Sequence, residues 1–407
     1  MDYQTKNFFN PAPASIMYLD INSCFASLEQ QANPLLRGVP LVVAASNKPY
    51  GCILASSREA KLWGIKTGML VGDAKNICPF LVTREADPNK YRQVHDTIEG
   101  ILTKISDAVI SKSIDEFVLD FHSFHYSEAK LLDLSREIML LIKRQVGEWI
   151  TVSIGLAPNN FLAKLASNLH KSAGLDLINS KNYLEIYDSV SLCDLHGINR
   201  RLEKRLKAQG IFTPRDFFYA SPTKVKAAFQ SVVSYDWYMR LRGWEVDDYQ
   251  FARKSYGQSY VLPSPMQKPA WSPILAKLVD KAARRMRLSG YAARGVSLYL
   301  RFEGSDSSCH SHTQPKAVFT TSELLALTKS LYPQFSLDNP VKHLAVSFFD
   351  LLPLSISQLS LIDDVKKSTR LYQAIDKVND RYGAYSLKLA ALLGAGPHVK
   401  DAIAFGK

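Results

Sequence analysis

The chain is poor in cysteine, with five residues of this type among 407. The number is odd and no two are spaced as CxxC, which argues against both a disulfide framework and a zinc site. Cys309 lies close to His310 and His312, but the surrounding serines and aspartates, GSDSSCHSHTQP, predict a mobile loop rather than a metal site. We therefore expect reduced thiols.

Long apolar runs and targeting signals are also lacking. No apolar run approaches the ~20 residues that span a bilayer, and the first residues, MDYQTKNFFNPAPAS, do not follow the pattern of a secretory signal. We expect a cytoplasmic protein without a membrane partner. The hydrophobic content of 46% is enough for several packed cores, which excludes a disordered chain.

Acidic residues are outnumbered by basic ones, 38 to 50, which gives a net charge of +12. A chain of this charge attracts polyanions before specific contacts form, so nucleic acid is the first partner to consider. Charge alone leaves a generally basic, soluble surface as an equally good interpretation.

Three of the acids lie where predicted strands begin or end. SIMYLDI is typical of a buried strand that ends near Asp20, and EFVLDF alternates as a strand directly after Asp115 and begins with Glu116. Neighbouring strands of one sheet would bring the three carboxylates together, and such a cluster fits Mg²⁺ with substrate phosphates. From spacing alone, scattered surface acids are the more ordinary interpretation.

Several segments, taken together, resemble the Y-family translesion DNA polymerases over nearly the whole chain. The segments are YLDINSCFASLEQ, YGCILASSREAKLWGIKTGM, SIDEFVLDF, VSIGLAPNNFLAKLASNLHKSAGL, LHGINRRLEKRLKAQGIFTPRDF and KSYGQSY. The resemblance implies an α+β multi-domain fold, a right-hand polymerase with palm, fingers, a helical thumb containing a helix-hairpin-helix, and an α+β little finger. The expected boundaries are 1–32 and 92–178 for the palm, 33–91 for the fingers, 179–250 for the thumb, 251–352 for the little finger and 353–407 for a C-terminal tail with one helix.

The resemblance also assigns roles to individual residues. Asp20, Asp115 and Glu116 would be catalytic and would hold two Mg²⁺ ions together with the carbonyl of Ile21. Phe25 matches the steric gate that excludes a 2'-hydroxyl, although an ordinary core aromatic is the alternative. The other expected nucleotide-binding residues are Cys24, Arg58, Lys61 and Lys171. Lys164, seven residues before Lys171, shares the chemistry of the two lysines, and a solvated helix face explains it nearly as well.

DNA and clamp contacts are expected in the second half of the chain. Gly197 belongs to the thumb hairpin, in which Asn199 replaces the usual final glycine. Lys277, Lys281, Arg284 and Arg285 share one face of a predicted helix, where they would contact the duplex backbone. Gln358, Leu359, Leu361 and Ile362 resemble the QLxLF pentapeptide that engages the sliding clamp, a pattern that a surface loop also produces by chance.

The function that the resemblance implies is a DNA-directed DNA polymerase that adds deoxynucleotides to a primer, in error-prone translesion synthesis during DNA repair. Its partners would be primer-template DNA, deoxynucleoside triphosphates, a sliding clamp and possible accessory subunits. The alternative is a catalytically inactive scaffold that binds DNA and the clamp. A different palm-domain nucleotidyltransferase or cyclase would leave the thumb hairpin and the little finger unexplained. The motifs leave the lesion and the choice between DinB-like and UmuC-like branches open.

Overall fold

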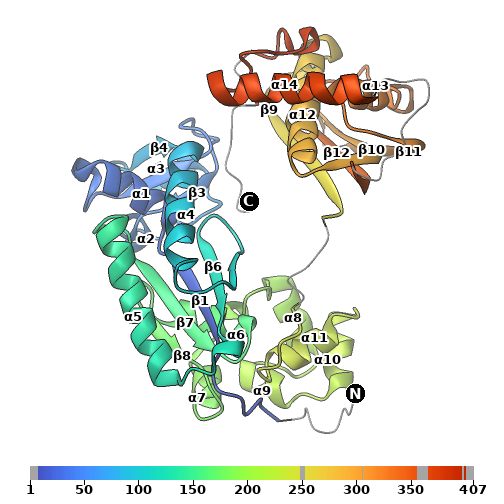
Figure 1. Cartoon of the computed structure of the whole chain (residues 1–407). Helices are drawn as coiled ribbons and strands as arrows, with labels where there is room; N and C mark the ends of the chain where they lie inside the picture. Colours follow the sequence, from blue (N-terminus) through green and yellow to red (C-terminus); the bar gives the residue numbers. More distant parts are fainter. Residues whose placement is uncertain (1–7, 248–252, 305, 355–364, 397, 400–407) are drawn as a thin grey trace. The chain divides into compact units, whose positions relative to one another are not determined.

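The computed structural model describes all residues except 1–7, 248–252, 305, 355–364, 397 and 400–407. The chain forms two compact units, the first ending at Tyr249 and the second beginning at Gln250 (Figure 1). Each unit has its own hydrophobic core. Short 3₁₀ turns occur at Pro34–Leu36, His122–Phe124, Leu192–Asp194, Tyr332–Gln334 and Ala390–Leu392.

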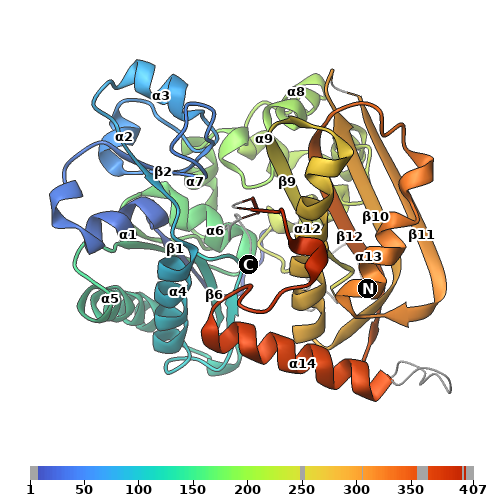
Figure 2. The ribbon, with the colours of Figure 1, turned by 90° about the horizontal axis from the view of Figure 1, so that it is seen from above.

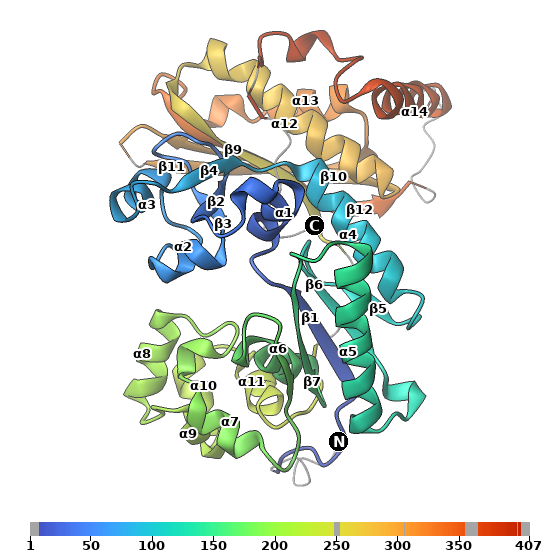
Figure 3. The same ribbon diagram turned by 90° about the vertical axis from the view of Figure 1, so that its left-hand side faces the viewer.

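A five-stranded sheet lies at the centre of the first unit, in the order β5-β6-β1-β7-β8. The strands are β1 (Ile16–Ile21), β5 (Val109–Ser111), β6 (Glu116–Asp120), β7 (Val152–Ala157) and β8 (Leu175–Leu177). One face packs on α4 (Pro88–Leu102) and α5 (Glu128–Gln145), and the other on α6 (Asn160–Leu169) (Figure 3). The residues of β1 that point to one face of the sheet and those that point to the other are mostly apolar, and the strand is buried on both sides.

The expected fingers region forms a three-stranded sheet of its own, in the order β3-β2-β4. Its elements are β2 (Leu41–Ala44), β3 (Ile53–Ser56), β4 (Val82–Glu85), α2 (Arg58–Leu62) and α3 (Val71–Ile77), preceded by α1 (Cys24–Ala32). Ser57 begins α2, where its side chain accepts a hydrogen bond from the Ala60 amide. This small helix carries Arg58 and Lys61.

The thumb region is entirely helical within the described residues between 178 and 247. Its helices are α7 (Tyr183–Ser189), α8 (Arg200–Ala208), α9 (Pro214–Tyr219), α10 (Pro222–Phe229) and α11 (Ser234–Arg240). Trp237 of α11 meets Phe161 of α6 edge to face at 5.2 Å, and Asn159 donates hydrogen bonds to the carbonyls of Arg240 and Trp244. The helices therefore share one core with the central sheet.

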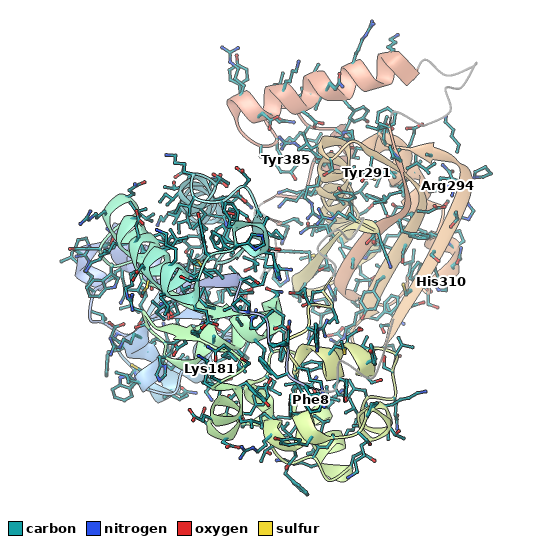
Figure 4. All side chains as sticks on the ribbon, turned by 60° about the horizontal axis from the view of Figure 1, so that its bottom comes forward. Phe8, Lys181, Tyr291, Arg294, His310 and Tyr385 are labelled. Atoms are coloured by element: carbon teal, nitrogen blue, oxygen red, sulfur yellow. The ribbon has the colours of Figure 1, made fainter. Side chains whose placement is uncertain are left out.

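The second unit is a four-stranded antiparallel sheet, in the order β11-β10-β12-β9, with two helices on one face. The strands are β9 (Ser255–Met266), β10 (Tyr291–Phe302), β11 (Ser307–Val318) and β12 (Val341–Pro353), and the helices are α12 (Lys268–Leu288) and α13 (Thr321–Lys329). The expected loop around Cys309, His310 and His312 is wrong, because this segment is the edge strand β11. Alternation places Cys309 on the opposite face from His310, which Figure 4 labels.

The described residues of the expected C-terminal tail belong to the second unit. Helix α14 (Val365–Tyr382) packs on α12 and α13, with Tyr372 6% exposed, and Leu392 and Val399 belong to the core of the second unit (Figure 2). The buried Arg287 pairs with Asp376 of α14 through two bonds of 3.2 Å. These elements are part of the second unit because they bury apolar side chains and satisfy its cations.

Candidate active site

The three expected catalytic acids lie at the end of the sheet where β1 pairs with β6. The antiparallel register places Asp20 opposite Glu116, and the Ile21 amide donates a 2.9 Å hydrogen bond to the Asp115 carbonyl. One sheet register thus joins residues that are 96 and 94 positions apart in the sequence. Two lysines reach this end, since Lys171 follows α6 and Lys164 lies within it.

Asp20 and Asp115 are held by different partners. Lys171 Nζ lies 2.6 Å from Asp20, and Ser113 Oγ donates to Asp115 at 2.6 Å. Burial raises the pKa of Asp20; Lys171 opposes the shift, while the other two acids add to it. Burial raises the pKa of Asp115 as well, against the hydrogen bond from Ser113. A nearby cation would therefore stabilise the charged form of both carboxylates.

Glu116 is the best neutralised of the three acids. Burial alone would raise its pKa, but the hydrogen bond and charge of Lys164 outweigh burial and lower it. Lys164 Nζ lies 2.7 Å from Glu116 and 3.2 Å from the Tyr18 hydroxyl. Burial, followed by the charge of Glu116, raises the pKa of Tyr18 above its usual range, so the hydroxyl stays a donor. The site thus contains a Tyr18–Lys164–Glu116 network.

The donor set fits a hard divalent cation. It consists of three carboxylates and the backbone oxygen of Ile21, which are the ligands that such ions prefer. Two ammonium groups already hold Asp20 and Glu116, which shows that the carboxylates accept cationic partners here. In the part of the chain that the structure describes, the three carboxylates are not gathered within 4.8 Å of one another as one set.

The expected nucleotide-binding residues lie around the same end of β1. Lys61 Nζ donates to Ser23 Oγ at 2.7 Å, and its pKa is lowered by burial and by the charge of Lys171, with Asp20 opposing. The charge of Lys171 acts on Lys61, and two neighbouring ammonium groups favour a polyanion between them. Arg58 is exposed at the first residue of α2. The positions fit triphosphate binding, which stays a prediction.

Phe25 and Cys24 begin α1 directly after Ser23, whose backbone is left-handed. Both side chains are 5% exposed. The Phe25 ring stacks on Tyr91 at 4.5 Å and 11°, and burial raises the pKa of the Cys24 thiol well above its usual range. The Phe25 ring is thus a packed core residue at the start of α1. Its assignment as a steric gate stays a prediction.

The thumb hairpin contains Gly197 at φ +96°, where a Cβ would lie 3.1 Å from the Trp237 ring. The next turn ends at Asn199, whose side chain accepts from the amides of Arg201 and Leu202 at 3.0 and 2.9 Å. Asn199 therefore occupies two amides at the start of α8 that would otherwise face an anion. DNA binding at Gly197 stays a prediction.

The four cations of the predicted basic face on α12 all have partners within the second unit, so their contact with DNA stays a prediction. Lys277 donates to the His398 carbonyl at 2.6 Å and Lys281 to the Val399 carbonyl at 3.4 Å. Arg284 pairs with Asp376 and Asp380 of α14, and Arg285 donates to Gly257 of β9. The helical spacing predicted that the four cations share one face of α12, but it did not predict that α14, β9 and residues 398–399 supply their partners.

Sequence reasoning missed Tyr18 and Ser113, and it grouped Lys164 with the phosphate-binding lysines. Tyr18 lies two positions before Asp20 in a strand, so the period of two puts both on one face. That signal could have found it. The clamp-like residues Gln358, Leu359, Leu361 and Ile362 lie outside the described residues.

Comparison with known proteins gives the family. A sequence model of the impB/mucB/samB family matches residues 19–168, and that of the family's C-terminal domain matches residues 253–361. The chain belongs to this family. Among its relatives, DNA polymerase IV of Moorella thermoacetica is 32% identical over 94% of the chain and 97% of the relative. DNA polymerase IV 1 of Bacillus subtilis is 27% identical over 93% of each.

Solved structures with the same fold are Y-family polymerases. A Y-family DNA polymerase chimera of Dbh and Dpo4 has a TM-score of 0.72 at 22% identity, covering 83% of the chain and 99% of the chimera. An insertion ternary complex of Dbh DNA polymerase has a TM-score of 0.61 over the same shares, also at 22% identity. The family's fold is therefore the α+β multi-domain fold of the Y-family polymerases, as the sequence predicted. No described helix is long and apolar enough to cross a membrane.

Proposed function

We propose that the chain is a DNA-directed DNA polymerase that extends a primer in translesion synthesis, using two Mg²⁺ ions. The observation that carries this function is the sheet register, which places Asp20 opposite Glu116 and Ile21 against Asp115, at the end where Lys171 pairs with Asp20. A scaffold that only binds DNA has no use for two half-buried carboxyl groups of raised pKa, Asp20 and Asp115, which disfavours the inactive alternative. Relatives named DNA polymerase IV support the activity.

The acidic residues of the site would bind the metal ions, and two of its lysines would bind the triphosphate. Asp20, Asp115, Glu116 and the Ile21 carbonyl would hold the metal ions, which when bound activate the primer hydroxyl and neutralise the leaving pyrophosphate. Lys61 and Lys171 bind and orient the triphosphate, where their charges offset the negative charge of the leaving group. Lys164 and Tyr18 hold the Glu116 carboxylate in position.

Primer extension tests the proposed function. The reaction contains Mg²⁺, the four deoxynucleoside triphosphates and either undamaged or lesion-bearing template. We expect extension on both templates and none when Mg²⁺ is removed by a chelator. Template-dependent binding without any nucleotide addition would favour the scaffold instead.

A sliding clamp is the proposed partner of Gln358, Leu359, Leu361 and Ile362. The segment is bounded by elements of the second unit, since Leu354 donates to the Gly290 carbonyl at 2.8 Å and α14 begins at Val365. A pentapeptide between two packed elements suits insertion into a groove of a partner. Accessory subunits and a cytoplasmic location belong to the same proposal.

Replacing Gln358, Leu361 and Ile362 with alanine tests the clamp contact. We expect loss of clamp stimulation with clamp-free extension intact, because a few anchor residues carry most of such a binding energy. Melting temperature is measured beside both activities. A variant that melts early and loses both activities would place the pentapeptide in a core and remove the clamp assignment.

A further inference from the structure

One turn of α4 gathers three potential metal ligands away from the residues assigned to catalysis. An imidazole nitrogen of His95 and one carboxylate oxygen each of Asp96 and Glu99 all lie within 4.8 Å of one another. In the described part of the chain, no other three His, Cys, Asp or Glu side chains come this close. His95 and Glu99 are four positions apart and so share one helix face.

His95 is oriented and has a lone pair to offer. The side chain is 5% exposed, and its Nδ1 lies 3.0 Å from the Ile114 carbonyl. A carbonyl only accepts hydrogen bonds, so Nδ1 is the donor to Ile114, and Nε2 is the ring nitrogen available to a metal ion. Nε2 is buried and has no hydrogen-bond partner among the residues that the structure describes. A buried acceptor without a partner is costly, and a metal ion would satisfy it.

The surroundings of these residues resemble the outer shell of a metal site. Metal-binding histidines usually donate the second ring N–H to a carbonyl or a carboxylate, as His95 does to Ile114. The Ser111 hydroxyl donates to Glu99, which fixes that carboxylate. The His95 ring also stacks on Phe117 at 4.8 Å and 21°. Two of the three ligands are thus held by strands β5 and β6 or by the turn between them.

We propose that His95, Asp96 and Glu99 form a binding site for a divalent transition-metal ion, with Zn²⁺ as the ion that fits this ligand set. One imidazole nitrogen with two carboxylate oxygens suits zinc, whereas Mg²⁺ prefers oxygen ligands alone. Three protein ligands leave a position for water, which the exposed Asp96 permits. The ion would bind α4 next to the turn between β5 and β6, which contains Ile114 and Asp115. The proposal is independent of the proposed polymerase function.

Zinc binding to the full-length, chelator-treated protein tests the site. Calorimetric titration with ZnCl₂ is done in excess Mg²⁺, and repeated with Asp115→Asn so that the catalytic acids cannot account for the binding. We expect the double variant Asp96→Asn/Glu99→Gln to bind one zinc ion fewer per chain, or to bind it at least about 100-fold more weakly. Both changes preserve side-chain size, and primer extension in Mg²⁺ should stay within about twofold.

The control is His122→Ala, which removes an exposed histidine 3.0 Å from Asp120, a pair that no third ligand joins within the described residues. This variant should bind as much zinc as the wild type. At about 100 times the dissociation constant, zinc should raise the melting temperature of the wild type by about 5 °C and that of the double variant by much less. Equal zinc stoichiometry and affinity in the wild type and the double variant would overturn the proposal.

Discussion

The catalytic end of β1 and the outer face of α12 contain similar charges in different surroundings. At the catalytic end, Lys171 pairs with Asp20 and Lys164 with Glu116, two acids that we assign to metal binding. On α12, Arg284 pairs with Asp376 and Asp380 of α14, and Lys277 bonds to a carbonyl near the chain's end. Tyr385, labelled in Figure 4, places its ring 4.9 Å from Lys277.

The difference shows what a charge pattern means. Lys171 can exchange its partner when a polyanion arrives, because burial raises the pKa of its partner Asp20 and another cation would also stabilise that carboxylate. Pairs between α12 and α14 join two packed helices, so they stabilise the domain. Changes to the pairs at the end of β1 should therefore affect catalysis. Changes to the pairs between α12 and α14 should affect the free energy of unfolding.

The largest effect is expected for Asp115→Asn. The amide removes one charge at nearly constant volume, so nucleotide addition should fall at least about 10³-fold while primer-template affinity stays within a few-fold. Single-nucleotide insertion and fluorescence anisotropy measure the two quantities. The exposed Asp107→Asn serves as the matched control and should behave as wild type. Wild-type insertion by Asp115→Asn would contradict the metal assignment.

The next-largest effect is expected for Phe25→Ala. The rate of ribonucleotide insertion relative to deoxynucleotide insertion should rise about 10²-fold. Removing the ring opens space for a 2'-hydroxyl beside Asp20, although it also removes the contact with Tyr91. Insertion rates for matched ribo- and deoxynucleotides measure the selectivity. Tyr91→Leu removes the same stack from the other side and should leave selectivity unchanged. If both variants only lower the melting temperature, Phe25 is a core residue alone.

Asp376→Ala tests the pairs between α12 and α14. The change leaves Arg287, with 8% of its side chain exposed, without its carboxylate partner, so the free energy of unfolding should fall by about 3 kcal/mol. Insertion rates below the melting range should not change. Denaturant unfolding supplies the measurement, and the more exposed Asp380→Ala should cost less than about 1 kcal/mol. A gain in DNA affinity at unchanged stability would show that α14 masks a DNA surface.

The smallest effect is expected for Lys277→Ala on the salt dependence of DNA binding. Removing a cation that binds a DNA phosphate reduces the slope of log K against log salt by about 1, and we expect no such change for a lysine bonded to His398. Arg301→Ala, at an exposed position of β10 on the opposite face of the sheet, gives the comparison. A slope reduced by about 1 for Lys277→Ala would support the predicted contact between this face of α12 and the DNA backbone.

The sequence predicted the site better than the second unit. SIDE and YLDINSCFAS placed the acids at strand ends, and the pairing of β1 with β6 puts Asp20 opposite Glu116; their role as metal ligands stays a prediction. The prediction of a loop around Cys309 was wrong because its serines and histidines carry no apolar pattern, and only pairing with β10 makes the segment a strand. Tyr18 was missed although its spacing from Asp20 was informative.

The sequence by itself determined the family, the three carboxylates and the alternation of strands and helices, because these depend on residue types at short, regular spacings. The tertiary structure alone decided which cation met which anion. Lys164 and Lys171 share one segment yet bond to Glu116 and Asp20 on different strands, and Asp376 reaches Arg287 from 89 positions away. Such pairings depend on which surfaces are buried together, and apolar packing sets that across the whole chain.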